Sequence, residues 1–258
     1  MSDLNRKTDS AGKRDKGGAP SPSLPLPGKD DPSPLTRHPS LIPVIAIDGP
    51  SASGKGTVAQ RVANQLGYHY LDSGALYRLV ALAARQRGIS WQDAPALAAM
   101  TRSLNIQFEN GSILLDGLDV SEDLRAEEMS KGASEVAVHP GVRAALLDLQ
   151  HGLRKLPGLV ADGRDMATVV FPDAQTKIYL TASAETRAER RYKQLLEKGK
   201  KADLGEILRD LQQRDARDSQ RSTAPLQQCK DACLLETSNM SIEEAVRFVI
   251  DAFERQKK

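Results

Sequence analysis

The stretch GPSASGKGT, residues 49–57, combines glycines, hydroxyl residues and a lysine in a pattern suited to binding phosphate. Its glycines permit a tight turn and close approach of the backbone, and Lys55 is placed to reach the outer phosphates of a nucleoside triphosphate. If a strand precedes the loop and a helix follows it, backbone N–H groups at the helix N-terminus add further donors. We therefore predict that this loop holds phosphate oxygens; its residues are Gly49, Pro50, Ser51, Ala52, Ser53, Gly54, Lys55, Gly56 and Thr57.

One position departs from the familiar phosphate loop. That loop has Ser or Thr directly after the lysine, where its hydroxyl is a magnesium ligand. In this chain Gly56 stands in that place and Thr57 follows one residue later. Either Thr57 or a water molecule is then expected to be the ligand for Mg²⁺.

Arginines form the second group with chemical potential, because a planar guanidinium binds phosphate through two donors and keeps its charge. Arg164 lies in DGRD, at the expected end of a strand, where ligands bind in a parallel sheet. Two helical rows follow: Arg187, Arg190 and Arg191, then Arg214, Arg217 and Arg221 with Asp218. The alternative for any single arginine is a solvated surface or an ion pair with a nearby carboxylate. For Tyr77, just before Arg78, the alternative to a role in the site is that of a buried core residue of its helix.

The elements that must position these residues follow the order of an open parallel α/β sheet. Strands are predicted over 42–48, 68–71, 158–163, 177–182 and 233–238, and helices over 54–67, 72–88, 184–199 and 203–219. Ser73 and Ser183 are the expected N-caps of the helices over 72–88 and 184–199, and Gly67 and Gly199 are expected to end the helices over 54–67 and 184–199. The last helix opens on a Ser241–Glu244 capping box, and we expect it to bury Ile242, Val246, Val249 and Phe253.

The pattern changes over residues 104–156. Asn110-Gly111 and Asp116-Gly117 are hairpin-turn pairs between alternating apolar residues, which predicts a small antiparallel insert. Two helices, about 126–138 and 140–155, are expected after it, separated by Pro140.

Composition limits the class of protein. The net charge is +2, but residues 1–40 hold seven Lys or Arg and five Asp, which leaves 29 basic and 29 acidic residues in 41–258. This balance argues against a nucleic-acid partner. The Pro- and Ser-rich stretch 1–40 is expected to be a disordered tail. No apolar run is long enough for a membrane span, no secretory signal is visible, and Cys229 and Cys233 are expected to be reduced thiols in a cytoplasmic protein.

Taken together, IDGPSASGKGT, LDSGALYR, ADGRDMATVVFPDA, ERRYKQL and QRDARDSQRSTAPL resemble the bacterial-type cytidylate kinases. The resemblance covers nearly all of 41–258. It implies an α/β P-loop kinase with a parallel β-sheet core flanked by helices, a mobile lid at about 186–200 and a small antiparallel α+β insert, about 104–156, in the domain that binds the nucleoside monophosphate. It also implies transfer of the γ-phosphoryl group from ATP to CMP or dCMP, with Mg²⁺, giving ADP and CDP or dCDP.

The resemblance assigns the remaining residues to the site. The loop 49–57 is implied to bind the phosphates of ATP, and Lys55, Arg164, Arg190 and Arg191 are implied as catalytic. Those implied to bind the acceptor are Ser73, Tyr77, Arg78, Arg143, Arg164, Asp165, Arg214, Asp218 and Arg221. The expected partners are CMP, dCMP and ATP, with no nucleic acid and no membrane, and the expected state is a monomer.

Two rival hypotheses stay open at this point. The first is a related kinase with another acceptor, such as AMP, UMP or shikimate. The second is a nucleotide-binding switch or a nucleic-acid motor that uses the same loop, against which stand the neutral core and the small size.

Overall fold

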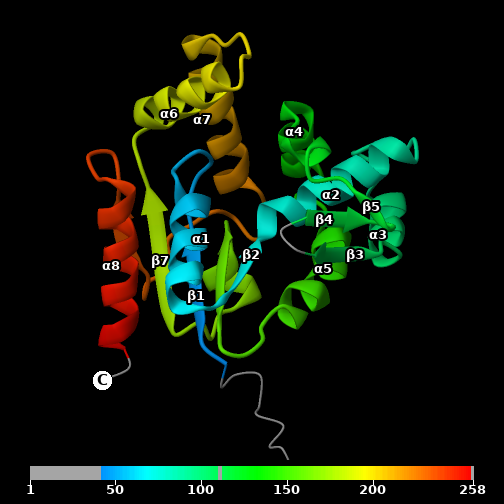
Figure 1. The fold of residues 1–258 in the computed structure, drawn as a ribbon. Coiled ribbons are helices and arrows are strands. Elements are labelled where there is room, and N and C mark those ends of the chain that lie inside the picture. The colour runs from blue at the N-terminus through cyan, green and yellow to red at the C-terminus, as the bar shows by residue number, and fades with distance from the viewer. Residues whose placement is uncertain (1–41, 110–111, 257–258) are drawn as a thin grey trace, which may run out of the picture. The chain divides into compact units, whose positions relative to one another are not determined.

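The structure of the protein is a computed structural model that describes residues 42–109 and 112–256. The predicted tail, 1–40, and the Asn110-Gly111 turn lie outside the described residues. A five-stranded parallel sheet has the order β2–β6–β1–β7–β8 (Figure 1). Its strands are β1 (Val44–Asp48), β2 (His69–Asp72), β6 (Leu159–Gly163), β7 (Thr176–Thr181) and β8 (Cys233–Glu236).

The central strand β1 is apolar throughout because both of its faces are covered. Val44 and Ala46 belong to one buried cluster, and Ile45 and Ile47 belong to another. The second cluster includes α1 (Lys55–Leu66) and α8 (Ile242–Arg255), while the first includes α2 (Ser73–Gln86). Alternating side chains on a strand that is buried on both faces give the continuous apolar run VIAID.

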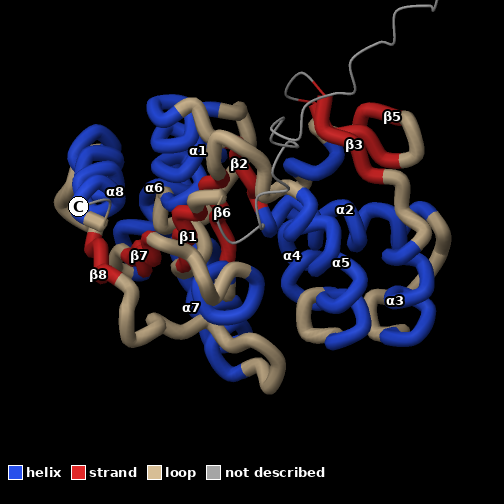
Figure 2. Tube along the Cα trace, turned by 90° about the horizontal axis from the view of Figure 1, so that it is seen from below, coloured by secondary structure: helices blue, strands red, loops and turns tan. Residues whose placement is uncertain are grey.

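The insert carries a three-stranded sheet of β3 (Ile106–Glu109), β4 (Ser112–Leu115) and β5 (Leu118–Asp119), antiparallel as predicted. Asp116 and Gly117 both have positive φ, 51° and 84°, which confirms the second turn. Around it lie α3 (Ala94–Arg102), η2 (Asp123–Arg125), α4 (Glu127–Val136) and α5 (Pro140–Gly152). Figure 2 shows α2 to α5 grouped beside the parallel sheet.

Two local predictions were incomplete or wrong. Helix α3 was not predicted; it is short, and Asp93 caps it by accepting from the Ala96 N–H at 3.1 Å. Asp72, not Ser73, caps α2, because its carboxylate accepts from the Ala75 N–H at 3.0 Å. The predicted start of the helix at residue 140 is confirmed: Pro140 begins α5, as its fixed φ suits the first turn of a helix.

Two further helices, α6 (Ala184–Glu197) and α7 (Leu204–Gln220), form the hairpin at the top of Figure 1, and Ser183 caps α6 as predicted. A short π-helical segment, η3 (Met166–Val170), follows β6 and was not predicted. Both cysteines are free thiols. No helix within 42–109 and 112–256 has the length and apolar character needed to cross a membrane.

Helix α8 has the predicted capping box, but one of its four predicted core residues was placed wrongly. Val246, Val249 and Phe253 are at most 3% exposed, whereas Ile242 is 40% exposed. Ile242 is the first residue of the helix and lies at the rim of a large cleft, where no element covers it fully.

This difference gives a stability prediction. Val246→Ala should lower the free energy of unfolding by about 2 kcal/mol, because it removes buried methyl groups and leaves a cavity. Ile242→Ala should change it by less than about 0.5 kcal/mol. Urea unfolding of the two variants measures both, and equal losses would contradict the difference in burial between Val246 and Ile242.

Candidate active site

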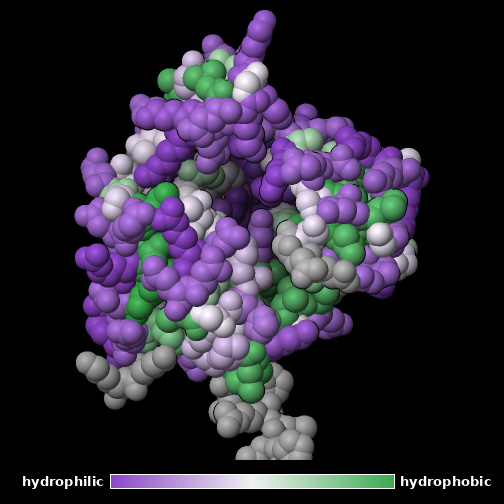
Figure 3. Space-filling view, viewed as in Figure 1, coloured by the Kyte–Doolittle hydropathy of each residue, from purple (hydrophilic) through white to green (hydrophobic). Residues whose placement is uncertain are grey.

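A cleft of about 990 Å³ opens beyond the carboxyl ends of the parallel strands. Figure 3 shows it as a hollow lined by hydrophilic residues. All predicted site residues line it except Gly49 and Pro50. In the strand order, the connection after β1 leads to β2, on one side of β1, and the connection after β6 leads to β7, on the other side. The cleft lies at this change of direction, which is where ligands bind in such sheets.

Gly49 and Pro50 shape the loop from behind. A Cβ on Gly49 would lie 1.9 Å from the carbonyl oxygen of Leu180, so only glycine fits against β7. Gly54 has φ +93° and precedes α1, which directs the first N–H groups of that helix toward the cleft. Lys55 Nζ donates to the Pro50 carbonyl at 3.2 Å across the loop. The predicted strand–loop–helix arrangement is therefore present.

The ammonium of Lys55 is almost buried, with 8% of the residue exposed. Burial lowers the pKa of Lys55 to about 7, and the neighbouring Arg164 lowers it further, while Asp162 and Asp72 oppose the change. The loop thus holds a cation that its surroundings do not fully compensate. An anionic group entering the cleft would supply the missing charge.

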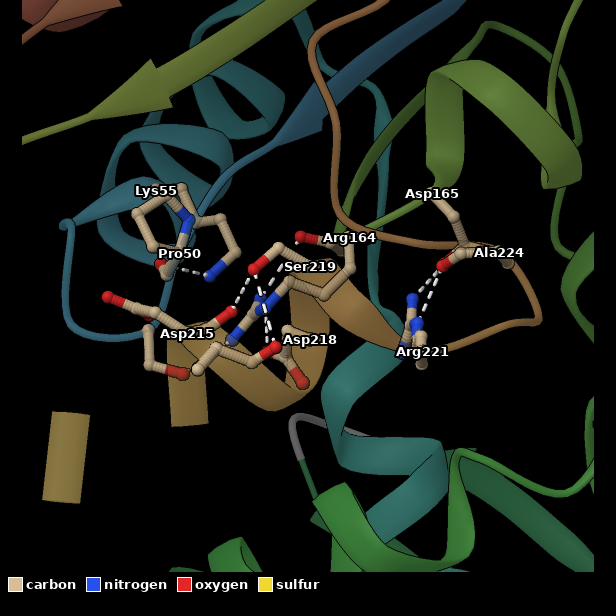
Figure 4. A network of polar contacts seen from close by, with 12 residues as sticks. Pro50, Lys55, Arg164, Asp165, Asp215, Asp218, Ser219, Arg221 and Ala224 are labelled. Atoms are coloured by element: carbon tan, nitrogen blue, oxygen red, sulfur yellow. Dashed lines mark hydrogen bonds and ion pairs between the residues drawn. The ribbon is translucent and has the colours of Figure 1, made fainter. Parts of the chain in front are cut away.

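Arg164 joins the phosphate loop to α7. Its Nη2 donates to Ser51 Oγ at 2.7 Å and its Nε donates to Asp218 Oδ2 at 3.0 Å. In Figure 4 its side chain lies between Lys55 on one side and Asp165 and Arg221 on the other. Burial would raise the pKa of Asp218, but Arg164 and Arg214 outweigh this effect and lower it. Asp218 is therefore ionised and fixes the direction of Arg164.

The far end of the cleft has a carboxylate–arginine floor. Arg143 donates to Asp165, and its guanidinium lies 5.6 Å from the centroid of the Tyr77 ring. Arg221 approaches the other oxygen of Asp165 at 3.9 Å. Ser134 of α4 faces the same floor, and its buried hydroxyl has no partner among the described residues. A buried hydroxyl without a partner is costly, so this end of the cleft is suited to a polar ligand.

Between the phosphate loop and the carboxylate–arginine floor, several arginine N–H groups lack a hydrogen-bond partner among the described residues. The Nε atoms of Arg214 and Arg78 are buried without a hydrogen-bond partner among the described residues. Burial lowers the pKa of Arg214 to about 10, and Arg164 adds to the effect. Arg78 reaches Asp72 only at 3.8 Å. Because a guanidinium binds phosphate through several N–H groups, these two arginines are suited to bind the oxygens of a phosphate.

The arginines of α6 divide into two kinds. Arg187 is buried and clamps the loop to the hairpin, since it donates to the Ser51 carbonyl at 3.1 Å and to Asp215 at 2.6 Å. Arg190 donates to the Ser53 carbonyl at 3.1 Å and to the Thr237 carbonyl at 2.6 Å. Arg191 instead forms an ion pair with Glu127 of α4, across the mouth of the cleft. For Arg187 the structure therefore shows the alternative that the sequence left open, an ion pair with a carboxylate, here that of Asp215.

Sequence reasoning missed several residues that line the cleft. Asp72 is the last residue of β2, Asp162 is the last but one of β6, and the two lie opposite each other in register. Their position at strand ends was a usable signal, as was that of Thr237 just after β8. Ser134 carried no signal, because a serine in the middle of a helix is usually a surface residue.

A divalent cation has two carboxylates and one hydroxyl available near the loop. Asp72, Asp162 and the exposed Thr57 all line the cleft. The described residues contain no cluster of three or more His, Cys, Asp or Glu that would enclose a metal ion. Such a donor set fits Mg²⁺, which keeps several waters and shares its remaining positions with substrate phosphates.

Asp48, at the end of β1, supports the cleft from below. It is 2% exposed, and its two oxygens accept from the N–H groups of Met166 and Ala167, each at 2.8 Å. Because these residues directly follow Arg164 and Asp165, this carboxylate fixes the turn that carries both. Burial raises the pKa of Asp48 to about 7, although the two hydrogen bonds oppose the change.

Comparison with known proteins gives one consistent result. A family model described as "Cytidylate kinase" matches residues 45–255. The cytidylate kinase of Chromobacterium violaceum is 57% identical over 216 residues, which are 84% of this chain and 97% of that protein. That of Polynucleobacter asymbioticus is 58% identical over 215 residues, 83% of this chain and 98% of that protein. A gluconokinase structure from Sinorhizobium meliloti 1021 resembles this chain only distantly, with TM-score 0.42 and 16% identity over 83% of this chain and 92% of its own.

The buried carboxylate of Asp48 predicts a pH dependence of stability. Its pKa is raised in the folded chain above its ordinary 3.8, so its stabilising contribution is complete below about pH 4 and is lost as the pH rises to about 7. Between pH 5 and pH 7 the free energy of unfolding of the unaltered chain should fall relative to that of Asp48→Asn by about 2 kcal/mol. Urea unfolding across pH 5 to 8.5 measures this difference. A difference that stays constant, or that rises with pH, would contradict the burial assigned to Asp48.

Proposed function

The chain belongs to the cytidylate kinase family, and we propose that its cleft transfers the γ-phosphoryl group of ATP to CMP or dCMP. The observation that carries the proposal is the row of incompletely paired cations between a phosphate loop at one end and a carboxylate–arginine floor at the other. Phosphoryl transfer requires positioning and neutralisation of charge more than covalent chemistry. One phosphate chain and one monophosphate entering from opposite ends would meet at Arg164.

On the ATP side, the loop N–H groups and Lys55 bind the phosphates. The lowered pKa of Lys55 supports this role, because a polyphosphate beside it restores the charged form. On the acceptor side, Arg78, Arg164 and Arg214 bind the monophosphate, and their spare or redirectable donors support that assignment. The acceptor phosphate is already ionised, so the reaction needs no strong general base.

The floor of the cleft suits cytosine. The carboxylate of Asp165 accepts from the amino group of that base, while Arg143 and Ser134 donate to its ring nitrogen and carbonyl. Burial raises the pKa of Asp165, although Arg143, Arg221 and Arg164 oppose the change. Its ion pair with Arg143 favours the acceptor form. Uracil presents a carbonyl where cytosine presents an amino group, so Asp165 would face an acceptor without a proton between them. Asp218, Arg221, Ser73 and Tyr77 complete the acceptor side around the sugar.

Magnesium is part of the proposal. When bound, Mg²⁺ neutralises charge on the phosphates and orients the γ-phosphoryl group. Thr57, Asp72 and Asp162 would hold it, in part through water. We further propose that residues of about 186–200 act as a lid, in which Arg191 leaves Glu127 and, with Arg190, contacts the transferring group. Closure would exclude water and so limit hydrolysis of ATP.

The acceptor is tested by a panel of CMP, dCMP, UMP, AMP and shikimate with purified full chain, followed by ADP release. We expect kcat/KM for CMP or dCMP to exceed that for UMP and AMP by about 100-fold or more, the scale of a mismatched buried polar contact. Faster turnover of UMP or AMP would contradict the proposal. Hydrolysis of ATP that is stimulated by nucleic acid without CMP would favour the motor hypothesis instead.

Lys55→Ala should remove turnover while leaving the melting temperature within a few degrees.

Ser134 gives a separate test of the floor. Ser134→Ala should raise KM for CMP roughly fivefold, equivalent to about 1 kcal/mol for one lost hydrogen bond. Its melting temperature should not fall, because the hydroxyl has no partner among the described residues of the chain itself. Ser103→Ala, at the end of α3 and away from the residues that line the cleft, is the control and should leave KM within twofold. An unchanged KM in Ser134→Ala would remove Ser134 from the base site.

A further inference from the structure

Gly56 lies tightly against a side chain from the sheet, at the position where most phosphate loops carry a hydroxyl residue after the lysine. A Cβ built on Gly56 would lie 3.0 Å from Asp162 Oδ2 and 3.5 Å from the hydroxyl oxygen of Tyr70, so Asp162 would have to shift by a few tenths of an ångström. Asp162 is buried and belongs to the sheet, not to the loop. A carboxylate from β6 therefore lies next to the position that the hydroxyl residue has in most phosphate loops.

One hydrogen bond fixes that carboxylate. Tyr70 on β2 donates to Asp162 Oδ2 on β6 at 2.9 Å. The two strands pair in parallel with Asp72 opposite Asp162, so the Tyr70 side chain reaches diagonally to the neighbouring strand. Burial raises the pKa of Tyr70, and Asp162 beside it raises it further, which keeps the hydroxyl protonated and able to donate.

The carboxylate also faces the phosphate end of the cleft. Asp162 lines the cleft with Lys55 and Gly56, and it opposes the lowering of the Lys55 pKa by burial. In most phosphate loops a hydroxyl after the lysine is a ligand of the cation bound to the ATP phosphates. A carboxylate oxygen of Asp162 would be a suitable ligand for that cation from the same part of the cleft.

We propose that Tyr70 is a positioning residue, whose hydroxyl holds the Asp162 carboxylate over Gly56 so that it takes the place of the loop hydroxyl toward the divalent cation of ATP, directly or through water. This inference rests on the proposed function for its nucleotide and its metal. It accounts for Gly56, because Ser or Thr at that position would displace Asp162.

The first test compares Tyr70→Phe with Tyr68→Phe. Tyr68 lies two residues earlier, and the centroid of its ring lies 5.8 Å from that of Phe253 in an edge-on contact. Tyr68 and Tyr70 pack against the same hydrophobic cluster, so Tyr68→Phe is a matched loss of a phenolic hydroxyl. Electron paramagnetic resonance measures the affinity of Mn²⁺ for the full chain saturated with the non-hydrolysable imido analogue of ATP. Tyr70→Phe should weaken Mn²⁺ binding about tenfold, the usual effect of losing a group that orients a ligand. It should lower kcat with KM for CMP unchanged, and Tyr68→Phe should change neither.

The second test restores the usual loop residue. Gly56→Ser alone should weaken Mn²⁺ binding, because its side chain pushes against a carboxylate that Tyr70 holds in place. In Tyr70→Phe/Gly56→Ser the carboxylate is free to move aside, and the new hydroxyl takes over. The double variant should bind Mn²⁺ more tightly than either single variant.

Two outcomes would overturn the inference: unchanged Mn²⁺ affinity in a folded Tyr70→Phe chain, or losses that simply add in the double variant. Melting temperatures show which variants are folded. The Mn²⁺ measurement needs no acceptor, so a chain that ignores CMP but shows this pattern would contradict the proposed function and leave the role of Tyr70 standing.

Discussion

The structure depends on one constraint: several cations must stay close together in one cleft before any substrate arrives. Burial lowers the pKa values of Lys55 and Arg214, and the repulsion from Arg164 lowers them further. Like charges at such distances cost free energy unless carboxylates or ligand anions offset them. Asp218, Asp165 and Asp162 offset part of the repulsion, and the proposed function assigns the rest to the phosphates of the substrates.

The parallel sheet makes this arrangement possible. Three neighbouring strands end at the same edge, and each delivers a carboxylate there: Asp48 from β1, Asp72 from β2 and Asp162 from β6. The two residues after β6 supply Arg164 and Asp165, and Asp48 fixes their backbone. From outside the sheet, α7 adds Arg214 and Asp218, while α4 and α5 add Ser134 and Arg143. The strands and helices therefore fix the backbone positions of these charged residues, and so largely set the distances between the charges.

Local patterns in the sequence were enough to find the loop, the arginine rows and most strands, because each depends on neighbours within a few residues. What could not be predicted depends on contacts between distant segments. The bond from Tyr70 to Asp162 requires the register of β2 against β6, and the partnerless hydroxyl of Ser134 requires α4 to face Asp165. Ile242 followed the apolar spacing of α8 but lies at its open end, and Asp72 took the capping role expected of Ser73. In each case tertiary packing decided between two locally acceptable choices.

If substrate phosphate completes the charge balance of the cleft, the melting temperature with CMP and with cytidine tests this most directly. A ligand that binds the folded chain raises the melting temperature according to its affinity. We expect CMP to raise it by several degrees, with a gain that shrinks as salt is added, and cytidine at the same concentration to raise it little. Equal stabilisation by CMP and cytidine, independent of salt, would contradict this role of the phosphate.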